Sequence, residues 1–261
     1  MTRTSQTPLV LFAIGIIGLG IVALVYGDFA QVWQPAAAWV PGRTGLAYTS
    51  GIVMLLGGIG LLLRWTTALS ARLLFPYLII GFLLQVPAVV MTPLVEVNWE
   101  GAGEQAVLLS GGWVLFATRS GLGEGSLLAF ATGENGLRIA RILFAVALLP
   151  IGLSHFVYLK DTVGLVPAWL PFRTGWVYLT GAGHLVAGLG VLFSVVPRLA
   201  ATMEAGMLSV FTILVWIPRI VAAPTTRATW TEFFISWAVT AAAWVVASSI
   251  ARKNTPSASI I

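Results

Sequence analysis

The residues best suited to chemistry in this sequence are polar side chains set among long apolar segments. The six that group by predicted position are His155, Arg173, Thr180, His184, Arg219 and Glu232. An ionisable group in apolar surroundings is energetically costly, so each is a candidate for function. Together they could bind a polar headgroup, an anion or a quinone carbonyl.

His184 is the strongest of these candidates. It follows Arg173 by 11 residues, which is roughly 16 Å along a helix and about half the depth of a bilayer. Helical spacing predicts that Arg173, Thr180 and His184 share one face, and a buried Arg219–Glu232 pair could face the histidines. In the alternative interpretation these residues only pack: His184 bonds to a neighbouring helix and the others extend to the membrane surface.

Several chemistries are excluded or weakly supported. The chain has no cysteine, which removes disulfides, thiol redox chemistry, cysteine-ligated metals and iron–sulfur clusters. Two histidines and a carboxylate at long separation are a weak metal signal, so no metal site is predicted. No nucleophile–base pair or nucleotide-binding loop is evident, so we expect no catalytic residue. No basic stripe or motif indicates a nucleic-acid partner.

The composition indicates that a lipid bilayer surrounds these residues. Of 261 residues, 58% are hydrophobic and 9% are charged, and the mean hydropathy is +0.95. So few charged side chains cannot form the polar surface of a soluble protein. Eleven Trp and 28 Gly also fit a membrane protein, because indoles favour the interface and glycine is common in membrane helices.

The hydropathy pattern predicts an all-α integral membrane protein with eight transmembrane helices. About 20 mostly apolar residues span the hydrocarbon layer as a helix. The eighth segment, 101–118, is weaker because Glu104 and Gln105 lie at its start. The seven clear segments are 8–26, 44–63, 73–91, 139–158, 175–196, 199–221 and 233–250.

An internal repeat supports the eighth helix. Residues 37–51 read AAWVPGRTGLAYTSG and residues 167–181 read PAWLPFRTGWVYLTG, at an offset of 130. Pro87 and Pro218, Trp99 and Trp230, and Trp113 and Trp244 pair at an offset of 131. We therefore predict a tandem duplication, with repeats at 1–118 and 138–261 joined by a linker at 119–137. Four helices per repeat make the two copies parallel in the membrane rather than inverted.

The repeated motif has a structural interpretation. Each Pro stands just ahead of a helix, each Trp lies at interface depth, and the glycines that follow permit close helix contact. We expect these roles for Trp39, Pro41, Arg43, Tyr48 and Gly51, and for Trp169, Pro171, Arg173, Tyr178 and Gly181.

The distribution of Lys and Arg predicts an orientation in the cell membrane. With eight spans, nine of these residues lie on one side and five on the other. The side with more of them is normally cytoplasmic. Both termini are therefore expected in the cytoplasm. The nine are Arg3, Arg64, Arg72, Arg119, Arg138, Arg141, Arg198, Arg252 and Lys253.

At the repeated motif the sequence resembles the DoxX-like membrane proteins. The second half matches through GLSHF at 152–156, PAWLP at 167–171 and YLTGAGHLVAGLGVLF at 178–193. The first half matches through GDF at 27–29, AWVP at 38–41 and YTSG at 48–51. The resemblance implies a fused pair of four-helix units. It also implies a non-catalytic subunit or scaffold, with a membrane or redox-complex protein as partner and a quinone reached through that partner.

The sequence leaves two functions open. The first is the scaffold or subunit of a quinone-linked redox complex. The second is a binder or transporter of a small molecule, lipid or quinone, which uses the polar pocket of the second half. His184 corresponds to Met54 in the first half, so the copies have diverged at this position and any site is expected to be asymmetric.

Overall fold

The structure is a computed structural model that describes residues 6–30, 34, 36, 39–123 and 125–251. Within these ranges the chain is all-α. Arg3, Arg252 and Lys253, which entered the predicted orientation, lie outside the described residues, as do Ala37 and Ala38 of the repeated motif.

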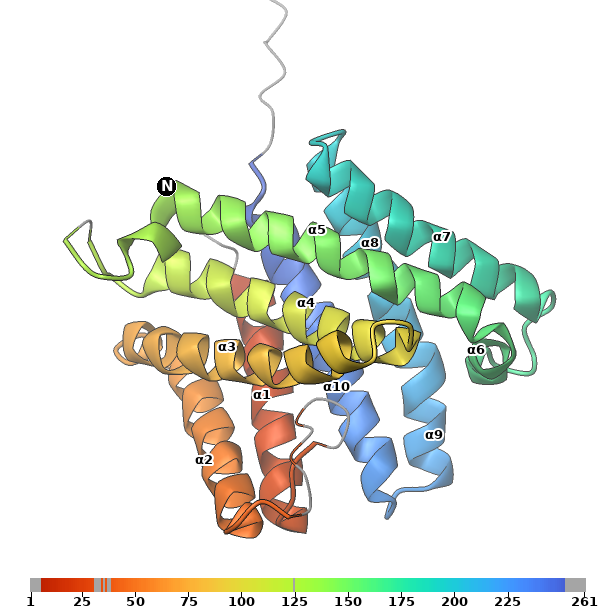
Figure 1. Ribbon diagram of the computed structural model, residues 1–261, viewed down its shortest axis with the longest axis horizontal. Coiled ribbons are helices and arrows are strands. Elements are labelled where there is room, and N and C mark those ends of the chain that lie inside the picture. Colours follow the sequence, from red (N-terminus) through yellow and green to blue (C-terminus); the bar gives the residue numbers. More distant parts are fainter. Residues whose placement is uncertain (1–5, 31–33, 35, 37–38, 124, 252–261) are drawn as a thin grey trace, which may run out of the picture.

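Long helices make up most of the described chain (Figure 1). Two short elements, η1 and α6, lie in connections, and a π-helical turn, η2, joins α8 to α9. The elements are α1 (Gln6–Tyr26), α2 (Arg43–Leu62), α3 (Thr67–Met91), α4 (Glu96–Arg119), η1 (Ala129–Ala131), α5 (Gly133–Val157), α6 (Leu159–Leu165), α7 (Arg173–Leu192), α8 (Pro197–Phe211), η2 (Thr212–Trp216), α9 (Ile217–Ala222) and α10 (Arg227–Ser249).

Seven helices of the described chain, rather than the eight expected, are long and apolar enough to cross a membrane. They are α1, α2, α3, α5, α7, α10 and the continuous segment Pro197–Ala222. The remaining helix, α4, has 24 residues and is long enough. It is too polar, because Glu96, Glu100 and Glu104 lie in its first three turns and Arg119 ends it.

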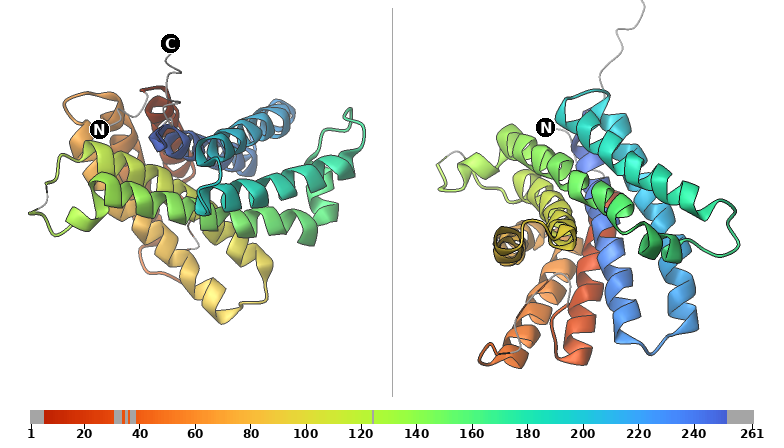
Figure 2. Two further views of the ribbon diagram at one scale, coloured as in Figure 1. Left: turned by 90° about the horizontal axis from the view of Figure 1, so that it is seen from above. Right: turned by 45° about the vertical axis from the view of Figure 1, so that its right-hand side comes forward.

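The helices form two sets that cross each other. In Figure 1, α1, α2, α9 and α10 run down the view and α3, α4, α5 and α7 run across it. In the first set α1 packs on both α2 and α10; in the second, α4 packs on both α3 and α5. The contact between α4 and α10 joins the two sets at the centre, and the two turned views agree on this arrangement (Figure 2).

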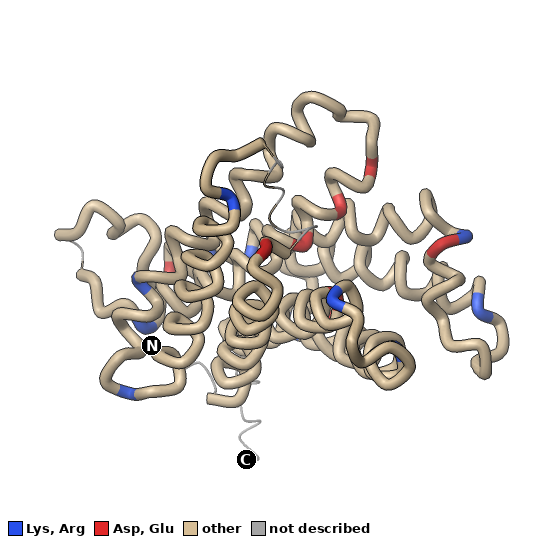
Figure 3. The backbone as a smooth tube through the Cα atoms, turned by 90° about the horizontal axis from the view of Figure 1, so that it is seen from below, with Lys and Arg blue, Asp and Glu red and all other residues tan. Residues whose placement is uncertain are grey.

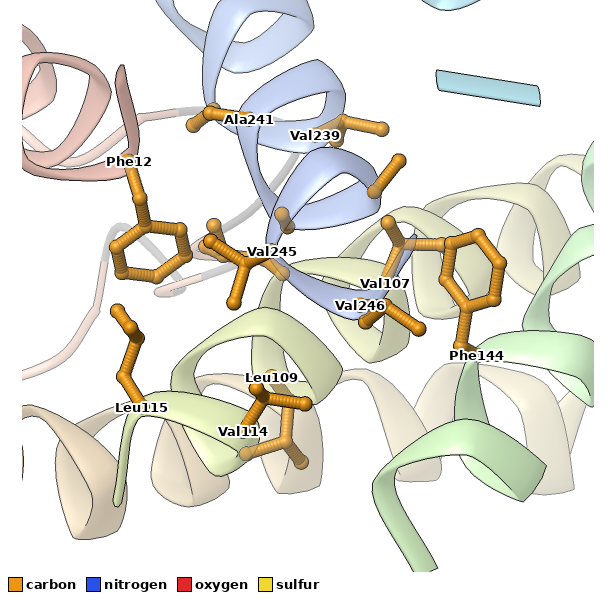
Figure 4. Packing of buried hydrophobic residues seen from close by; sticks show 14 of the residues in the cluster. Phe12, Val107, Leu109, Val114, Leu115, Phe144, Val239, Ala241, Val245 and Val246 are labelled. Carbon is orange, nitrogen blue, oxygen red and sulfur yellow. The ribbon is translucent and has the colours of Figure 1, made fainter. Parts of the chain in front are cut away.

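Small residues allow α4 and α10 to approach closely. A Cβ atom on Gly111 would lie 2.7 Å from the Cα atom of Ala242, closer than real Cβ contacts. Around this contact Phe12, Val107 and Phe144 fill the core, each fully buried (Figure 4). Since α3, α5 and α10 enclose α4, its polar residues are shielded by protein, which explains how so polar a helix lies in an apolar bundle.

Helix ends gather in two regions. In Figure 1 the connections α2–α3, α4–α5 and α7–α8 lie at the left and top, whereas α1–α2, α3–α4 and α9–α10 lie at the bottom and right. Charged side chains are sparse along the backbone, and long stretches between them carry none (Figure 3).

Segments that match in sequence also match in local structure. The Nε atoms of Arg43 and Arg173 each donate to the carbonyl seven residues earlier, at 3.2 and 3.0 Å. The indole nitrogens of Trp99 and Trp230 each donate to the carbonyl six residues earlier, at 2.9 and 2.7 Å. Trp39 and Trp169 are both exposed, at 82% and 70%.

The connection between the halves is shorter than predicted. The expected linker covers 119–137, but α5 already begins at Gly133. Of the apolar stretch SLLAFA, only Ala129–Ala131 forms a single 3-10 turn. The short helix α6 was not predicted from the sequence; it follows α5 directly and leads to the second copy of the motif.

Candidate functional site

A buried polar contact joins α7 to α8. The Nδ1 atom of His184 lies 2.7 Å from Oε1 of Glu204. The two residues expose only 4% and 1% of their surface. A lone imidazole or carboxyl group at this depth would lose its hydrogen bonds to water and gain none. The contact offsets that cost for both groups.

The ring of His155 lies beside this pair. Its ring centroid lies 5.0 Å from that of His184, and the ring planes are tilted by 56°. The Nδ1 atom of His155 lies 2.9 Å from the carbonyl oxygen of Ile151. Since a carbonyl only accepts, Nδ1 carries the proton and the neutral ring keeps a lone pair on Nε2. His155 thus offers a hydrogen-bond acceptor.

Glycine permits the close approach of the two histidine-bearing helices. A Cβ atom on Gly181 of α7 would lie 2.8 Å from the Cβ atom of His155 on α5. A side chain at position 181 would therefore push α7 away from α5. The last glycine of the repeated motif thus sets the spacing between His155 and His184.

These residues border a cavity of about 260 Å³. It lies between α4, α5, α6, α7, α8, η2 and α10, and several of these helices contribute polar side chains to its wall. The polar lining consists of Glu100, Glu104, Ser154, His155, Thr162, Thr180, His184, Trp216, Glu232 and Ser236.

Two polar atoms around the cavity have no hydrogen-bond partner among the described residues. They are Nε1 of Trp216, in the cavity lining, and Oε2 of Glu204, behind His184. By contrast Glu100 is engaged, because Ser154 Oγ donates to its Oε1 at 2.9 Å. An unpaired buried indole N–H costs roughly 1–3 kcal/mol. A ligand that accepts from Trp216 would recover that cost.

Trp216 ends a π-helical turn. The turn covers Thr212–Trp216 and precedes Pro218, which has no N–H to continue the helix. Such turns occur often at functional sites. At Pro218 the helix does not end: it widens into the π turn and continues to Ala222. The hydroxyl of Thr212 bonds to Ser236 of α10 at 2.7 Å and holds the turn in place.

An apolar cavity of about 320 Å³ adjoins the polar one. The two share six lining residues, among them His155 and Thr180, so they meet at these side chains. The apolar cavity is also lined by Leu179 and Val210, which are 60% and 55% exposed on the outer surface of the bundle. A polar chamber thus continues into an apolar one that reaches the outer surface.

The structure brings together four of the six side chains predicted from the sequence. His155, Thr180, His184 and Glu232 all line the polar cavity. Thr180 belongs to both cavities, and its hydroxyl donates to the carbonyl of Trp176 at 2.9 Å.

The two arginines lie elsewhere, and the expected Arg219–Glu232 pair is not among the ion pairs of the described residues. Arg173 donates to the carbonyls of Val166 and Val163, at 3.0 and 2.6 Å. Arg219 stacks over the ring of Trp216, with its Cζ atom 5.2 Å from the centroid. Since the C-terminus of a helix attracts cations, Arg173 stabilises the end of α6 rather than a ligand.

Sequence reasoning missed Glu204, Glu100 and Trp216. Glu204 gave a usable signal, because it is a lone acid in the middle of an apolar helix. Glu100 and Trp216 gave none, since acids and indoles near helix ends are common in membrane proteins. No group of three or more His, Asp or Glu residues suited to a metal ion occurs among the described residues.

The predicted repeat aligns this pair with apolar residues of the first half. His184 corresponds to Met54 and Glu204 to Leu74, both at an offset of 130. Met54 and Leu74 are buried, at 4% and 2% exposure. The predicted alignment therefore sets the polar pair opposite two buried apolar residues.

A second charged cluster joins three helices of one set, α1, α2 and α10, near the end of α1. Asp28 forms ion pairs with Arg43, which begins α2, and with Arg227, which begins α10. Burial alone would raise the pKa of Asp28. Hydrogen bonds from Arg227, from the amide of Phe29 and from Arg43 outweigh it, so the pKa lies below its usual value.

Comparison with known protein families places a domain of unknown function (DUF8561) at residues 144–247. The match starts within α5 and ends within α10. It therefore contains His155, His184, Glu204 and Glu232, but not α4. The resemblance to the DoxX-like proteins is not shown by this comparison. No curated protein and no solved structure matches the chain.

Proposed function

We propose that this multi-pass membrane protein binds a small amphipathic molecule in the polar cavity of its second half. The buried His184–Glu204 contact carries the proposal. A hydrogen-bonded ionisable pair in an apolar bundle is costly to maintain, and the first half packs the same place with Met54 and Leu74. Packing alone therefore does not require the polar pair.

The shape and chemistry of the two cavities define the ligand class. The polar chamber offers the indole N–H of Trp216 as a donor and the lone pair of His155 as an acceptor. The adjoining apolar cavity reaches the surface at Leu179 and Val210. A polar head with an apolar tail fits this arrangement, and quinones and lipids belong to that class. A molecule dissolved in the bilayer would enter sideways.

The proposal includes an architecture of two parallel four-helix repeats of the DoxX-like type. The matched hydrogen bonds of Arg43 and Arg173, and of Trp99 and Trp230, support it. So does the alternation of helix ends. In this proposal α4 is an eighth crossing, and α3, α5 and α10 shield it from lipid. The excess of Lys and Arg on one side supports a cytoplasmic location for both termini.

A role as a subunit of a larger complex, such as a quinone-linked redox complex, is the second candidate. Two spans favour it. In α3 and in Pro197–Ala222, only 22% of an apolar 18-residue stretch is buried inside the protein. These two spans leave wide apolar faces that lipid or a partner subunit would cover. A scaffold of this kind needs no catalytic residue.

One experiment tests both candidates. The protein is purified in a mild detergent, and copurifying quinones, lipids and proteins are identified by mass spectrometry. The double variant His184→Met/Glu204→Leu introduces the residue types of Met54 and Leu74 in the first half. Met203→Leu, on the exposed side of α8, is the matched control. We expect a small molecule with the wild type and the control, reduced at least tenfold in the double variant.

Other outcomes are equally informative. If the double variant retains the small molecule in full, the assigned site is rejected. If a stoichiometric protein partner copurifies and no small molecule does, the subunit role replaces the binding role. If neither copurifies, both candidates fail.

A further inference from the structure

A separate cavity of about 400 Å³ lies in the first half of the chain. It is lined by α1, α2, α3 and α4 and by Phe29, Ala30 and Gln34 after α1, and none of its lining residues belongs to the second-half cavities. Most of the lining is aliphatic or aromatic, including Leu19, Phe29 and Leu108. Its polar lining groups are Gln34, Thr49, Ser50, Tyr77 and Gln105.

Three of these polar groups form a closed hydrogen-bonded triangle. Gln34 Nε2 donates to Ser50 Oγ and to Tyr77 Oη, each at 2.7 Å. Ser50 Oγ and Tyr77 Oη are also 2.7 Å apart. The amide of Gln34 is oriented by the backbone, because the N–H of Ala30 donates to its Oε1 at 3.1 Å. The amide NH₂ group must therefore point at the two hydroxyls.

A count of protons shows that the triangle has one donor to spare. Gln34 brings two N–H groups, and Ser50 and Tyr77 bring one O–H each. The three edges of the triangle use three of these four protons. Whichever hydroxyl accepts along the Ser50–Tyr77 edge keeps its own proton, and neither hydroxyl makes a further hydrogen bond among the described residues. Ser50 is only 8% exposed, so water does not readily supply one.

The cavity reaches the outer surface of the bundle between α2 and α3. Its lining residues Leu46 on α2 and Ile80 and Leu84 on α3 are 50%, 59% and 48% exposed. In a membrane these side chains contact lipid tails. An apolar molecule can therefore enter from the bilayer, with the triangle at the inner wall of the cavity.

We propose that this cavity binds one lipid-like molecule whose carbonyl oxygen accepts the spare hydroxyl proton of the Ser50–Tyr77 pair. The apolar lining accommodates an acyl or isoprenoid chain, and the single donor selects a chain that carries an acceptor. A cationic or strongly charged head is disfavoured, because no side chain that lines the cavity is ionised at neutral pH. This site is independent of the one in the second half and rests on different residues.

Photolabelling in proteoliposomes tests the proposal. The wild-type protein is reconstituted with a small fraction of a diazirine-tailed fatty acid methyl ester, irradiated, and mapped by peptide mass spectrometry. A diazirine-tailed alkane of equal length is the parallel probe. We expect adducts of the ester to concentrate on cavity-lining residues of α2 and α3, roughly two- to tenfold above the alkane, since one net hydrogen bond has about that value.

The variant Gln34→Glu removes the spare proton with little change in the shape of the cavity, because a carboxyl group brings at most one proton where the amide brings two, and the three edges then use every proton. Gln34→Glu should lower ester labelling of the cavity to the level of the alkane. Tyr48→Phe, on the same helix but outside the cavity lining, should leave it unchanged. Equal labelling by ester and alkane in the wild type overturns the proposal even if Gln34→Glu fails to fold. Adducts spread evenly over the lipid-facing helices also overturn it.

Discussion

The His184–Glu204 contact makes a quantitative prediction about coupling between two residues. The single variants His184→Met and Glu204→Leu each leave a buried polar group alone, whereas the double variant reproduces the apolar pair of the first half. An ordinary hydrogen bond between membrane helices couples its partners by about 0.6 kcal/mol, with a maximum near 1.7 kcal/mol. Breaking a buried ion pair costs roughly 3–5 kcal/mol, and replacing it with packed apolar residues is often neutral.

The geometry of the His184–Glu204 contact predicts a coupling free energy toward the upper end of these values. The 2.7 Å separation lies at the short end of the range for charge-assisted bonds, and the residues are 4% and 1% exposed. We therefore expect a coupling free energy of at least about 2 kcal/mol, or roughly 30-fold in the unfolding equilibrium. The double variant should be close to the wild type in stability.

Equilibrium unfolding in mixed micelles, followed by tryptophan fluorescence, measures all four proteins of the cycle. The coupling free energy is the change in unfolding free energy of the double variant minus the sum of the changes of the two single variants. A value within about 0.3 kcal/mol of zero would refute the contact itself. A double variant far less stable than either single variant would refute the idea that the two halves share one packing scheme.

Two further predictions concern other parts of the bundle. Because the pKa of Asp28 is held below its ordinary value, its ion pairs stabilise the fold above the unfolded pKa of about 3.9 and are lost as pH falls through the lower folded pKa. On acidification below that value, the free energy of unfolding of the wild type should therefore fall by about 1 kcal/mol more than that of Asp28→Asn. The effect is modest because the paired side chains are 20–26% exposed. Equal falls in the two proteins would contradict this prediction. Gly42 has a φ of 67° and open space where a Cβ atom would lie, so Gly42→Ala should cost about 1–2 kcal/mol through its backbone alone. Gly45 has equally open space but lies within α2, so Gly45→Ala should instead raise the free energy of unfolding by about 0.5–1 kcal/mol. Thermal unfolding of the two variants shows whether one is destabilised and the other stabilised.

The helices were largely predictable because a bilayer imposes a simple rule on sequence. A span must be long and apolar. Six of the seven clearly apolar predicted segments end within one residue of the last residue of a helix that meets this requirement. The predicted segment 175–196 instead runs past the end of α7 at Leu192. The predicted eighth span, α4, is too polar to qualify, and hydropathy reports the composition of a helix and not its surroundings. Whether Glu100 faces lipid or protein depends on the neighbouring helices, and no local pattern contains that information.

The sequence by itself determined that the chain is an all-α membrane protein, and it singled out His184 by its isolation among apolar residues. Only the tertiary structure decided its partner. Glu204 lies 20 residues away on another helix, and the crossing of α7 and α8 brings the two side chains to 2.7 Å. The structure likewise removed Arg173 and Arg219 from the cavity. Long side chains reach whichever acceptor the fold places nearest, and here both extend to carbonyls of α6.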